Sequence, residues 1–96
     1  METVTAHIQI RGHVQGIGFR RFVVDVAEEF NISGLVENLS DGDVKAIAIG
    51  ERDVIDQFIE RIKLGNGYSI IEKFTVKWHE DGKPSGEFII ATSRWW

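Results

Sequence analysis

The chain has 96 residues, 43% of them hydrophobic, and a formal net charge of −4. That length predicts a single domain, residues 1–96, which can fold without metal ions, and the absence of cysteine excludes disulfides and cysteine-based zinc or redox sites. The acidic net charge argues against nucleic-acid binding. No apolar stretch reaches the roughly 20 residues that span a bilayer. We therefore expect a cytoplasmic protein without nucleic-acid or membrane partners.

Alternating apolar and polar residues predict a first strand from Thr3 to Arg11. Its apolar positions would face the core, and its polar positions would lie on an uncovered face of the sheet. Apolar residues then recur with helical spacing at Phe19, Phe22, Val23, Val26, Ala27 and Phe30. This pattern predicts a helix that begins near Phe19 and stops at 31–34.

The junction between this strand and this helix, GHVQGIGFR at residues 12–20, contains no side chain suited to capping a helix. The first turn of a helix leaves backbone N–H groups unpaired, and Ser, Thr, Asp or Asn usually accepts from one of them. Here Gly16, Ile17 and Gly18 precede the helix. Together with Gly12, these glycines allow positive φ angles and a concave run of N–H groups that favours an anion.

Charged residues at both ends of this helix are placed against its dipole. Arg20 and Arg21 lie at the positive end, and Glu28 and Glu29 lie near the negative end. Each such charge costs roughly 0.3–1 kcal/mol when exposed. A bound phosphate or similar anion would explain the arginines. The alternative is that the glycines only make a tight turn and that Arg21 pairs with Asp25.

The rest of the chain predicts four strands and one helix. Ser40, Asp41 and Gly42 are typical of a hairpin turn. Asp53 is expected to cap the second helix, and Gly65 is expected to end it. The expected strands are 35–39, 44–49, 74–78 and 87–92.

The resulting order is strand, helix, strand, strand, helix, strand, with a short extra C-terminal strand. This order is typical of an α+β, ferredoxin-like βαββαβ two-layer sandwich, with two helices on one face of a mostly antiparallel sheet. The same plan serves RNA binders, metal carriers, regulatory modules and enzymes, so it does not determine the function.

Two segments resemble a known family. GHVQGIGFR, residues 12–20, resembles the first signature of the acylphosphatase family, and GLVENLSDGDV, residues 34–44, resembles the second. The resemblance extends to about Ile90 and implies a single acylphosphatase-like domain. It also implies hydrolysis of acyl phosphates to a carboxylate and inorganic phosphate, without cofactor, metal or covalent intermediate.

The resemblance also implies roles for particular residues. Arg20 would grip the phosphoryl oxygens, and Asn38 would hold the attacking water. The phosphate cradle would be formed by the backbone N–H groups of Gln15, Gly16, Ile17, Gly18 and Phe19. The expected partners are a small-molecule acyl phosphate and the inorganic phosphate product, and we expect a monomer.

These residue types suit the chemistry. Phosphoryl transfer passes through a loose transition state with charge spread over the oxygens, so catalysis is mostly positioning and electrostatic stabilisation. Arg20 offers planar, bidentate donors, and Asn38 can donate and accept at once. Because a carboxylate departs readily, no strong general acid is required.

Other functions on the same fold remain open. One is a non-catalytic phosphate- or anion-binding regulatory module, and another is the acylphosphatase-like domain of hydrogenase-maturation carbamoyltransferases. An RNA-recognition module would need exposed aromatics on the first and third strands, and VKAIAI at 44–49 has none. His7, His13 and His79 are scattered, which indicates surface groups rather than zinc ligands.

Two positions differ from the usual signatures, and one later pair differs from the usual family sequence. Leu35 stands in place of an aromatic residue, and Glu37 in place of a basic one. Asn66-Gly67 replaces a common pair of prolines after the second helix. The tail, residues 93–96, extends past the usual end, and its two tryptophans could pack on the open sheet face or on a second subunit.

Overall fold

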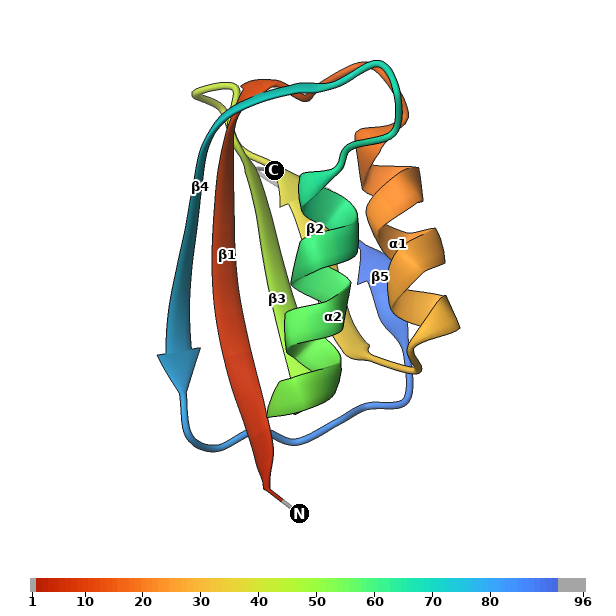
Figure 1. The fold of residues 1–96 in the computed structure, drawn as a ribbon, viewed down its shortest axis with the longest axis vertical. Coiled ribbons are helices and arrows are strands. Elements are labelled where there is room, and N and C mark those ends of the chain that lie inside the picture. Colours follow the sequence, from red (N-terminus) through yellow and green to blue (C-terminus); the bar gives the residue numbers. More distant parts are fainter. Residues whose placement is uncertain (1, 92–96) are drawn as a thin grey trace, which may run out of the picture.

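Two helices cover one face of a five-stranded sheet (Figure 1). The structure, a computed structural model, describes residues 2–91, so the tail lies outside the described residues. The elements are β1 (Thr3–His13), α1 (Phe19–Glu29), β2 (Ser33–Asn38), β3 (Val44–Glu51), α2 (Arg52–Lys63), β4 (Ile70–His79) and β5 (Phe88–Ile90). The strand order is β4-β1-β3-β2-β5, and every pair is antiparallel except β2–β5. The predicted ferredoxin-like βαββαβ sandwich with an added short strand is confirmed.

The core lies between the sheet and the helices. On β1, Ile8 and Ile10 are buried because alternate side chains of a strand point to the same face. Phe58 and Ile62 of α2 and Val23 of α1 are also completely buried. Each such side chain contributes about 1.5–3 kcal/mol through burial of apolar surface. This packing fixes where the N-terminus of α1 lies relative to the end of β2.

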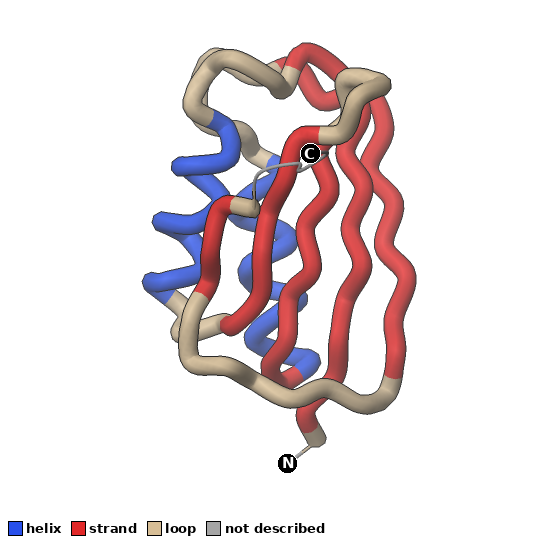
Figure 2. The backbone as a smooth tube through the Cα atoms, turned by 180° about the vertical axis from the view of Figure 1, so that it is seen from behind, coloured by secondary structure: helices blue, strands red, loops and turns tan. Residues whose placement is uncertain are grey.

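The opposite face of the sheet is only partly open. A loop spanning 80–87 crosses one end of it on the way from β4 to β5 (Figure 2). Thr5 Oγ1 donates a hydrogen bond of 2.7 Å to the carbonyl of Asp81, and the Gly86 N–H donates one of 2.8 Å to Ser33 Oγ. The predicted uncovered face is therefore correct only away from this loop.

The start of α2 differs from the prediction. The helix begins at Arg52 directly after β3, Glu51 is its N-cap, and no side chain caps it. Asp53 lies inside the first turn, where its carboxylate favours the helix dipole without closing a capping bond. The predicted Asp53 cap is wrong because β3 runs into α2 with no intervening loop.

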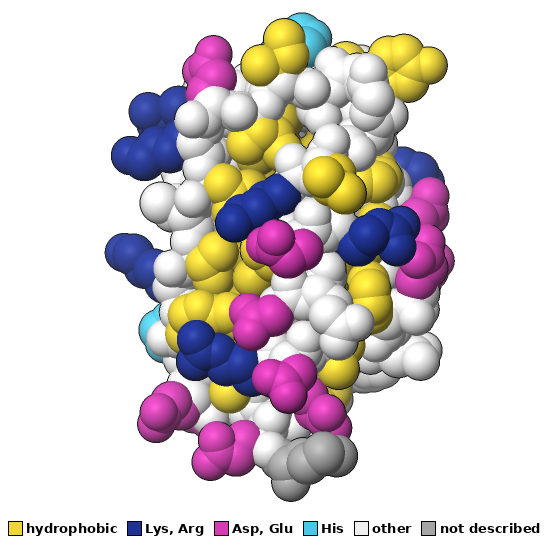
Figure 3. Space-filling view, viewed as in Figure 1, with side chains coloured by type: hydrophobic (Ala, Val, Ile, Leu, Met, Phe, Trp, Pro, Cys, Tyr) yellow, Lys and Arg dark blue, Asp and Glu magenta, His cyan; other side chains and the backbone are white. Residues whose placement is uncertain are grey.

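The surface of the helical face carries acidic and basic side chains side by side (Figure 3). On this face they form no patch of a single sign of the kind that binding to a nucleic-acid backbone requires. Among residues 2–91, no helix has the length and apolar composition needed to cross a bilayer.

Candidate active site

The turn before α1 has the backbone that its glycines predict. Gly18 is the N-cap of α1 with φ 76° and ψ 15°, and no side chain caps the helix. Gly16 has φ 76° as well. Both angles lie in the left-handed region that residues with a Cβ rarely adopt. The predicted uncapped N-terminus is confirmed.

A hollow of about 150 Å³ lies between this helix start and the end of β2. A space of this size holds several water molecules or a small anion. The hollow brings together five of the seven predicted site residues. Its lining includes Gly16, Gly18, Phe19, Arg20, Asn38 and, from β5, Ile90. The other two predicted residues, Gln15 and Ile17, do not line it and make contacts described below.

The charged residues at the ends of α1 differ in whether they have an ion-pair partner. Arg21 Nε lies 3.2 Å from Asp25 Oδ1, as the turn-only alternative expects. Glu29 at the other end forms two hydrogen bonds with the guanidinium of Arg61 on α2, at 3.0 and 3.4 Å. Arg20 is half-buried, and it forms no ion pair or side-chain hydrogen bond with any residue from 2 to 91. Within the described chain, Arg20 is therefore the arginine at the helix start that has no ion-pair partner.

Asn38 is the last residue of β2 and faces the helices, because it alternates with the buried Val36. Its Oδ1 is buried and has no hydrogen-bond partner within the described chain. Leaving such an acceptor unpaired costs about 1–3 kcal/mol, which a water or ligand in the hollow would recover. Glu37 lies on the opposite face, where it pairs in register with Lys45.

Gln15 connects the loop before α1 to the hairpin that follows Asn38. Its Nε2 donates to the carbonyl of Leu39 at 2.8 Å and to the carbonyl of Asp43 at 2.9 Å. These bonds hold the two sides of the hollow together. The resemblance implied only a backbone role for Gln15. Its side chain bonds a residue 24 positions away, and no local sequence pattern indicates such a contact.

The hairpin itself is held by a buried carboxylate. Asp43 Oδ2 accepts a hydrogen bond of 2.7 Å from Gln9 Nε2, and Asp43 Oδ1 lies 3.3 Å from Arg11 Nε. The Gln9 hydrogen bond, followed by the Arg11 charge, lowers the pKa of Asp43 below its ordinary value despite burial. Asp41 Oδ1 accepts from the Asp43 N–H at 2.9 Å. Asp41 therefore serves the predicted turn, whereas the Asp43 carboxylate ties the hairpin to β1.

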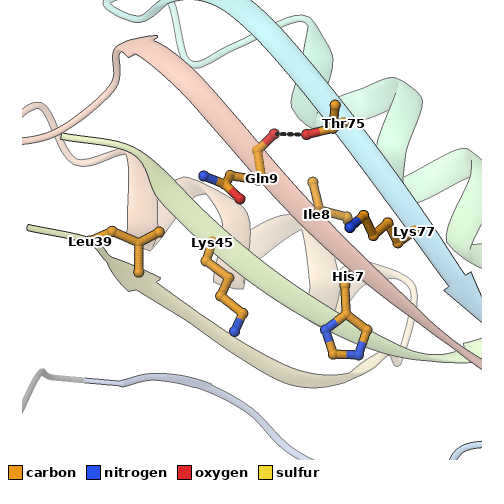
Figure 4. A pocket seen from close by; sticks show the side chains of 7 residues that line it. All are labelled: His7, Ile8, Gln9, Leu39, Lys45, Thr75 and Lys77. Carbon is orange, nitrogen blue, oxygen red and sulfur yellow. Dashed lines mark hydrogen bonds between the residues drawn. The ribbon is translucent and has the colours of Figure 1, made fainter. Parts of the chain in front are cut away.

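A larger hollow, about 250 Å³, lies on the open face of the sheet (Figure 4). It is lined by His7, Ile8, Gln9, Leu39, Lys45, Thr75 and Lys77. The His7 ring packs edge-on against His79 at 4.6 Å, and burial, followed by the charges of His79 and Lys45, lowers the pKa of His7. These two histidines are therefore neighbours rather than scattered. Residues 2–91 contain no cluster of three or more side chains suited to a metal ion.

Size does not decide between the two hollows. Among residues 2–91, the smaller one combines a guanidinium that lacks an ion pair, a buried acceptor without a partner and an uncapped helix start. The larger one contains none of these three features. The smaller hollow is therefore the candidate active site.

Replacing Gly16 by alanine should lower the free energy of unfolding by about 1 kcal/mol, because alanine is strained at a left-handed φ. An added Cβ would meet no atom within 4 Å, so steric overlap contributes nothing. Chemical denaturation checks this value. Gly16→Asn is the matched control and should lose less, because asparagine tolerates this region. Equal losses for both variants would contradict the conformational explanation.

Known proteins match nearly the whole chain. The family model for acylphosphatase matches residues 6–90. An acylphosphatase from Chloroflexus aurantiacus is 38% identical over 91 residues, which cover 95% of this chain and 99% of that protein. The crystal structure of acylphosphatase from Bacillus subtilis matches with a TM-score of 0.88 and 31% identity, over 92% of this chain and 98% of that chain.

A further match is to full-length HypF in a phosphate- and nucleotide-bound form, with a TM-score of 0.84 and 34% identity. That match covers 95% of this chain but only 12% of HypF. The Chloroflexus and Bacillus proteins, in contrast, match over nearly their whole length. From the span and identity of these matches, the chain belongs to the acylphosphatase family.

Proposed function

We propose that this acylphosphatase hydrolyses the carboxyl-phosphate anhydride of a small acyl phosphate in the hollow between α1 and β2. The observation that carries the proposal is that one hollow contains Arg20, the uncapped start of α1 and Asn38 Oδ1, which has no partner among residues 2–91. The positive groups suit the phosphoryl end of the substrate, and the amide suits a water molecule.

In the proposed site, the phosphoryl oxygens lie against Arg20 and the N–H groups of 15–19. Gly18 and the residues after it carry the N–H groups that an α-helix leaves unpaired at its first turn, and the helix dipole favours negative charge there. A guanidinium adds two parallel donors in the geometry of a phosphate edge. These groups stabilise the charge that spreads over the phosphoryl oxygens in the transition state.

Asn38 positions the nucleophile. Its Oδ1 accepts a hydrogen bond from a water molecule, whose oxygen then attacks phosphorus directly. The bond from phosphorus to the acyl oxygen breaks, the carboxylate leaves with the electron pair, and a proton of the water passes to a phosphate oxygen of the substrate. No protein group is covalently modified in this sequence.

The hydrolysis proposal is tested by measuring phosphate release from benzoyl phosphate, beside a phosphomonoester at the same concentration. The acyl phosphate should be hydrolysed and the phosphomonoester should be inert, because an alkoxide leaves far less readily than a carboxylate. Equal rates for both substrates would contradict the proposed dependence on the leaving group.

Inorganic phosphate should raise the melting temperature of the protein, because it binds the folded state at the start of α1. At a concentration 100 times the dissociation constant, the gain in unfolding free energy is about 2.7 kcal/mol. A thermal shift titration measures it, with Arg20→Ala as the variant that should lose the effect. Stabilisation without hydrolysis of benzoyl phosphate would favour the non-catalytic anion-binding module instead.

We further propose that the enzyme acts as a monomer in the cytoplasm. The proposed chemistry requires no second copy, because Arg20, Asn38 and the start of α1 lie on the same chain. Light scattering after gel filtration should give the mass of one chain at the concentrations used for assays. The cytoplasm is supported only by composition, since a chain without cysteine has no disulfide to maintain.

A further inference from the structure

The loop that follows α2 lies beside the loop that precedes α1, at the same end of the molecule (Figure 1). Asn66 joins them: its Nδ2 donates a hydrogen bond of 2.9 Å to the carbonyl of Ile17, 49 residues earlier. Among the described residues, it is the one hydrogen bond from a side chain to the backbone of residues 14–18. The carbonyl it holds lies between the two left-handed glycines of the candidate cradle.

The Asn66 side chain is itself held in place. Its Oδ1 accepts from the N–H groups of Tyr68 at 3.0 Å and Ser69 at 3.1 Å. The Asn66 N–H donates to Ser69 Oγ at 3.3 Å. With the oxygen fixed by two backbone donors, the amide nitrogen has one orientation, toward Ile17. Asn66 therefore stabilises the local turn with its Oδ1 and makes the long-range contact with its Nδ2.

The contact determines where a neighbouring donor points. The peptide bond between Ile17 and Gly18 is trans and planar, so the Ile17 carbonyl and the Gly18 N–H point in opposite directions. Gly18 lines the hollow, whereas Asn66 does not. Holding the carbonyl toward Asn66 therefore directs the Gly18 N–H away from Asn66, toward the side where the anion would bind.

The Ile17 side chain packs against the core and the Gly18 carbonyl accepts a hydrogen bond of 3.0 Å from the Phe22 N–H, but within the described chain only Asn66 bonds the Ile17 carbonyl itself. An added Cβ at Gly16 or Gly18 would meet no atom within 4 Å, so no neighbour packs against either glycine on that side. Glycine tolerates φ of either sign, so the peptide before Gly18 can rotate at small cost. A rotated peptide would present a carbonyl oxygen to the phosphate in place of an N–H.

We propose that Asn66 is a positioning residue for the phosphate cradle: its amide nitrogen holds the Ile17 carbonyl outward so that the Gly18 N–H faces the phosphoryl group. This inference rests on the proposed function. A purely structural role, as the turn that ends α2, is the competing explanation. The two differ in whether the donor atom or the acceptor atom of Asn66 matters for phosphate binding.

Two variants of Asn66 separate these roles. Asn66→Asp keeps an oxygen for the Tyr68 and Ser69 N–H groups and replaces the donor to Ile17 by a second acceptor. Asn66→Ser is uncharged, can still accept in the turn and is too short to reach Ile17. Ser69→Ala is the matched control, because it removes a hydrogen bond from the same turn and leaves the contact with Ile17 intact.

Both Asn66 variants should weaken inhibition by inorganic phosphate about tenfold and lower kcat/KM by roughly ten- to a hundredfold, below the effect of deleting a transition-state donor outright. Their unfolding midpoints should stay close to that of Ser69→Ala, which should keep wild-type kinetics. In ¹H–¹⁵N spectra, phosphate should shift the Gly18 amide of the wild type and of Ser69→Ala, and far less that of Asn66→Asp and Asn66→Ser.

The outcomes also separate this inference from the proposed function. If the wild type hydrolyses benzoyl phosphate but both Asn66 variants keep its phosphate affinity and its Gly18 shift, the positioning role is wrong and the proposed function stands. A loss in Asn66→Asp alone would assign the effect to the added charge and would also overturn the role. If the wild type neither hydrolyses benzoyl phosphate nor binds inorganic phosphate, the proposed function is wrong, and the positioning role is wrong with it.

Discussion

Arg20→Ala should lower the turnover of benzoyl phosphate by roughly three orders of magnitude or more, the scale associated with an arginine that stabilises a phosphoryl-transfer transition state. The reason is that Arg20 lacks an ion pair within the described chain, so its guanidinium is available to the substrate. Steady-state kinetics measure the effect. Arg20→Lys should recover only a small part of the loss, because an ammonium keeps the charge without the bidentate donors.

Arg21→Ala is the matched control for this prediction. It removes the same charge from the adjacent position, which also borders the hollow, but the Arg21 guanidinium is paired with Asp25 on the helix surface. Exposed pairs of this kind contribute little, so turnover should change by no more than a few fold. If the two alanine variants lost activity equally, the effect would come from positive charge near the helix start in general. It would not come from direct hydrogen bonds between Arg20 and the phosphoryl group.

Asn38→Ala should reduce kcat by up to about a thousandfold while leaving the inhibition constant for phosphate nearly unchanged. The division of roles explains the difference: the phosphate is held at α1, and the amide at the end of β2 holds only the water. Inhibition by phosphate and turnover are measured on the same preparation. A parallel collapse of phosphate affinity would show that Asn38 binds the anion itself.

Stability gives this variant an independent readout. Within the described chain Asn38 Oδ1 has no protein partner, so alanine removes no side-chain hydrogen bond of the fold at this oxygen. The unfolding midpoint of Asn38→Ala should therefore stay close to that of the wild type, so that a loss of kcat cannot be ascribed to unfolding. Glu37→Gln, on the opposite face of β2, is the control and should leave kcat unchanged.

The parts of the site that could be predicted from the sequence are local. The start of α1 at Phe19 follows from the helical spacing of apolar residues, and the left-handed Gly18 follows from the absence of a capping side chain. The turn at Asp41 and the alternation of β1 are local in the same way. The placement of Arg20 and Asn38 in one hollow was implied only by the resemblance, because they lie 18 positions apart, with most of α1 and β2 between them.

The parts that could not be predicted depend on contacts between distant segments. Asn66 reaches Ile17 across 49 residues, and its sequence context indicated only the end of a helix. Glu29 looks misplaced on α1 until Arg61 of α2 is seen beside it. The Asp53 cap failed because the strand before α2 runs to Glu51, and no periodic pattern marks where pairing stops. Tertiary packing decided each of these.

The most direct test of the site is a crystal structure of the protein with inorganic phosphate. The anion should lie at the start of α1, within hydrogen-bond distance of the Gly18 and Phe19 N–H groups and of the Arg20 guanidinium, with a water molecule on Asn38 Oδ1. Phosphate found instead among Lys45 and Lys77 on the open sheet face, with the start of α1 empty, would contradict this account.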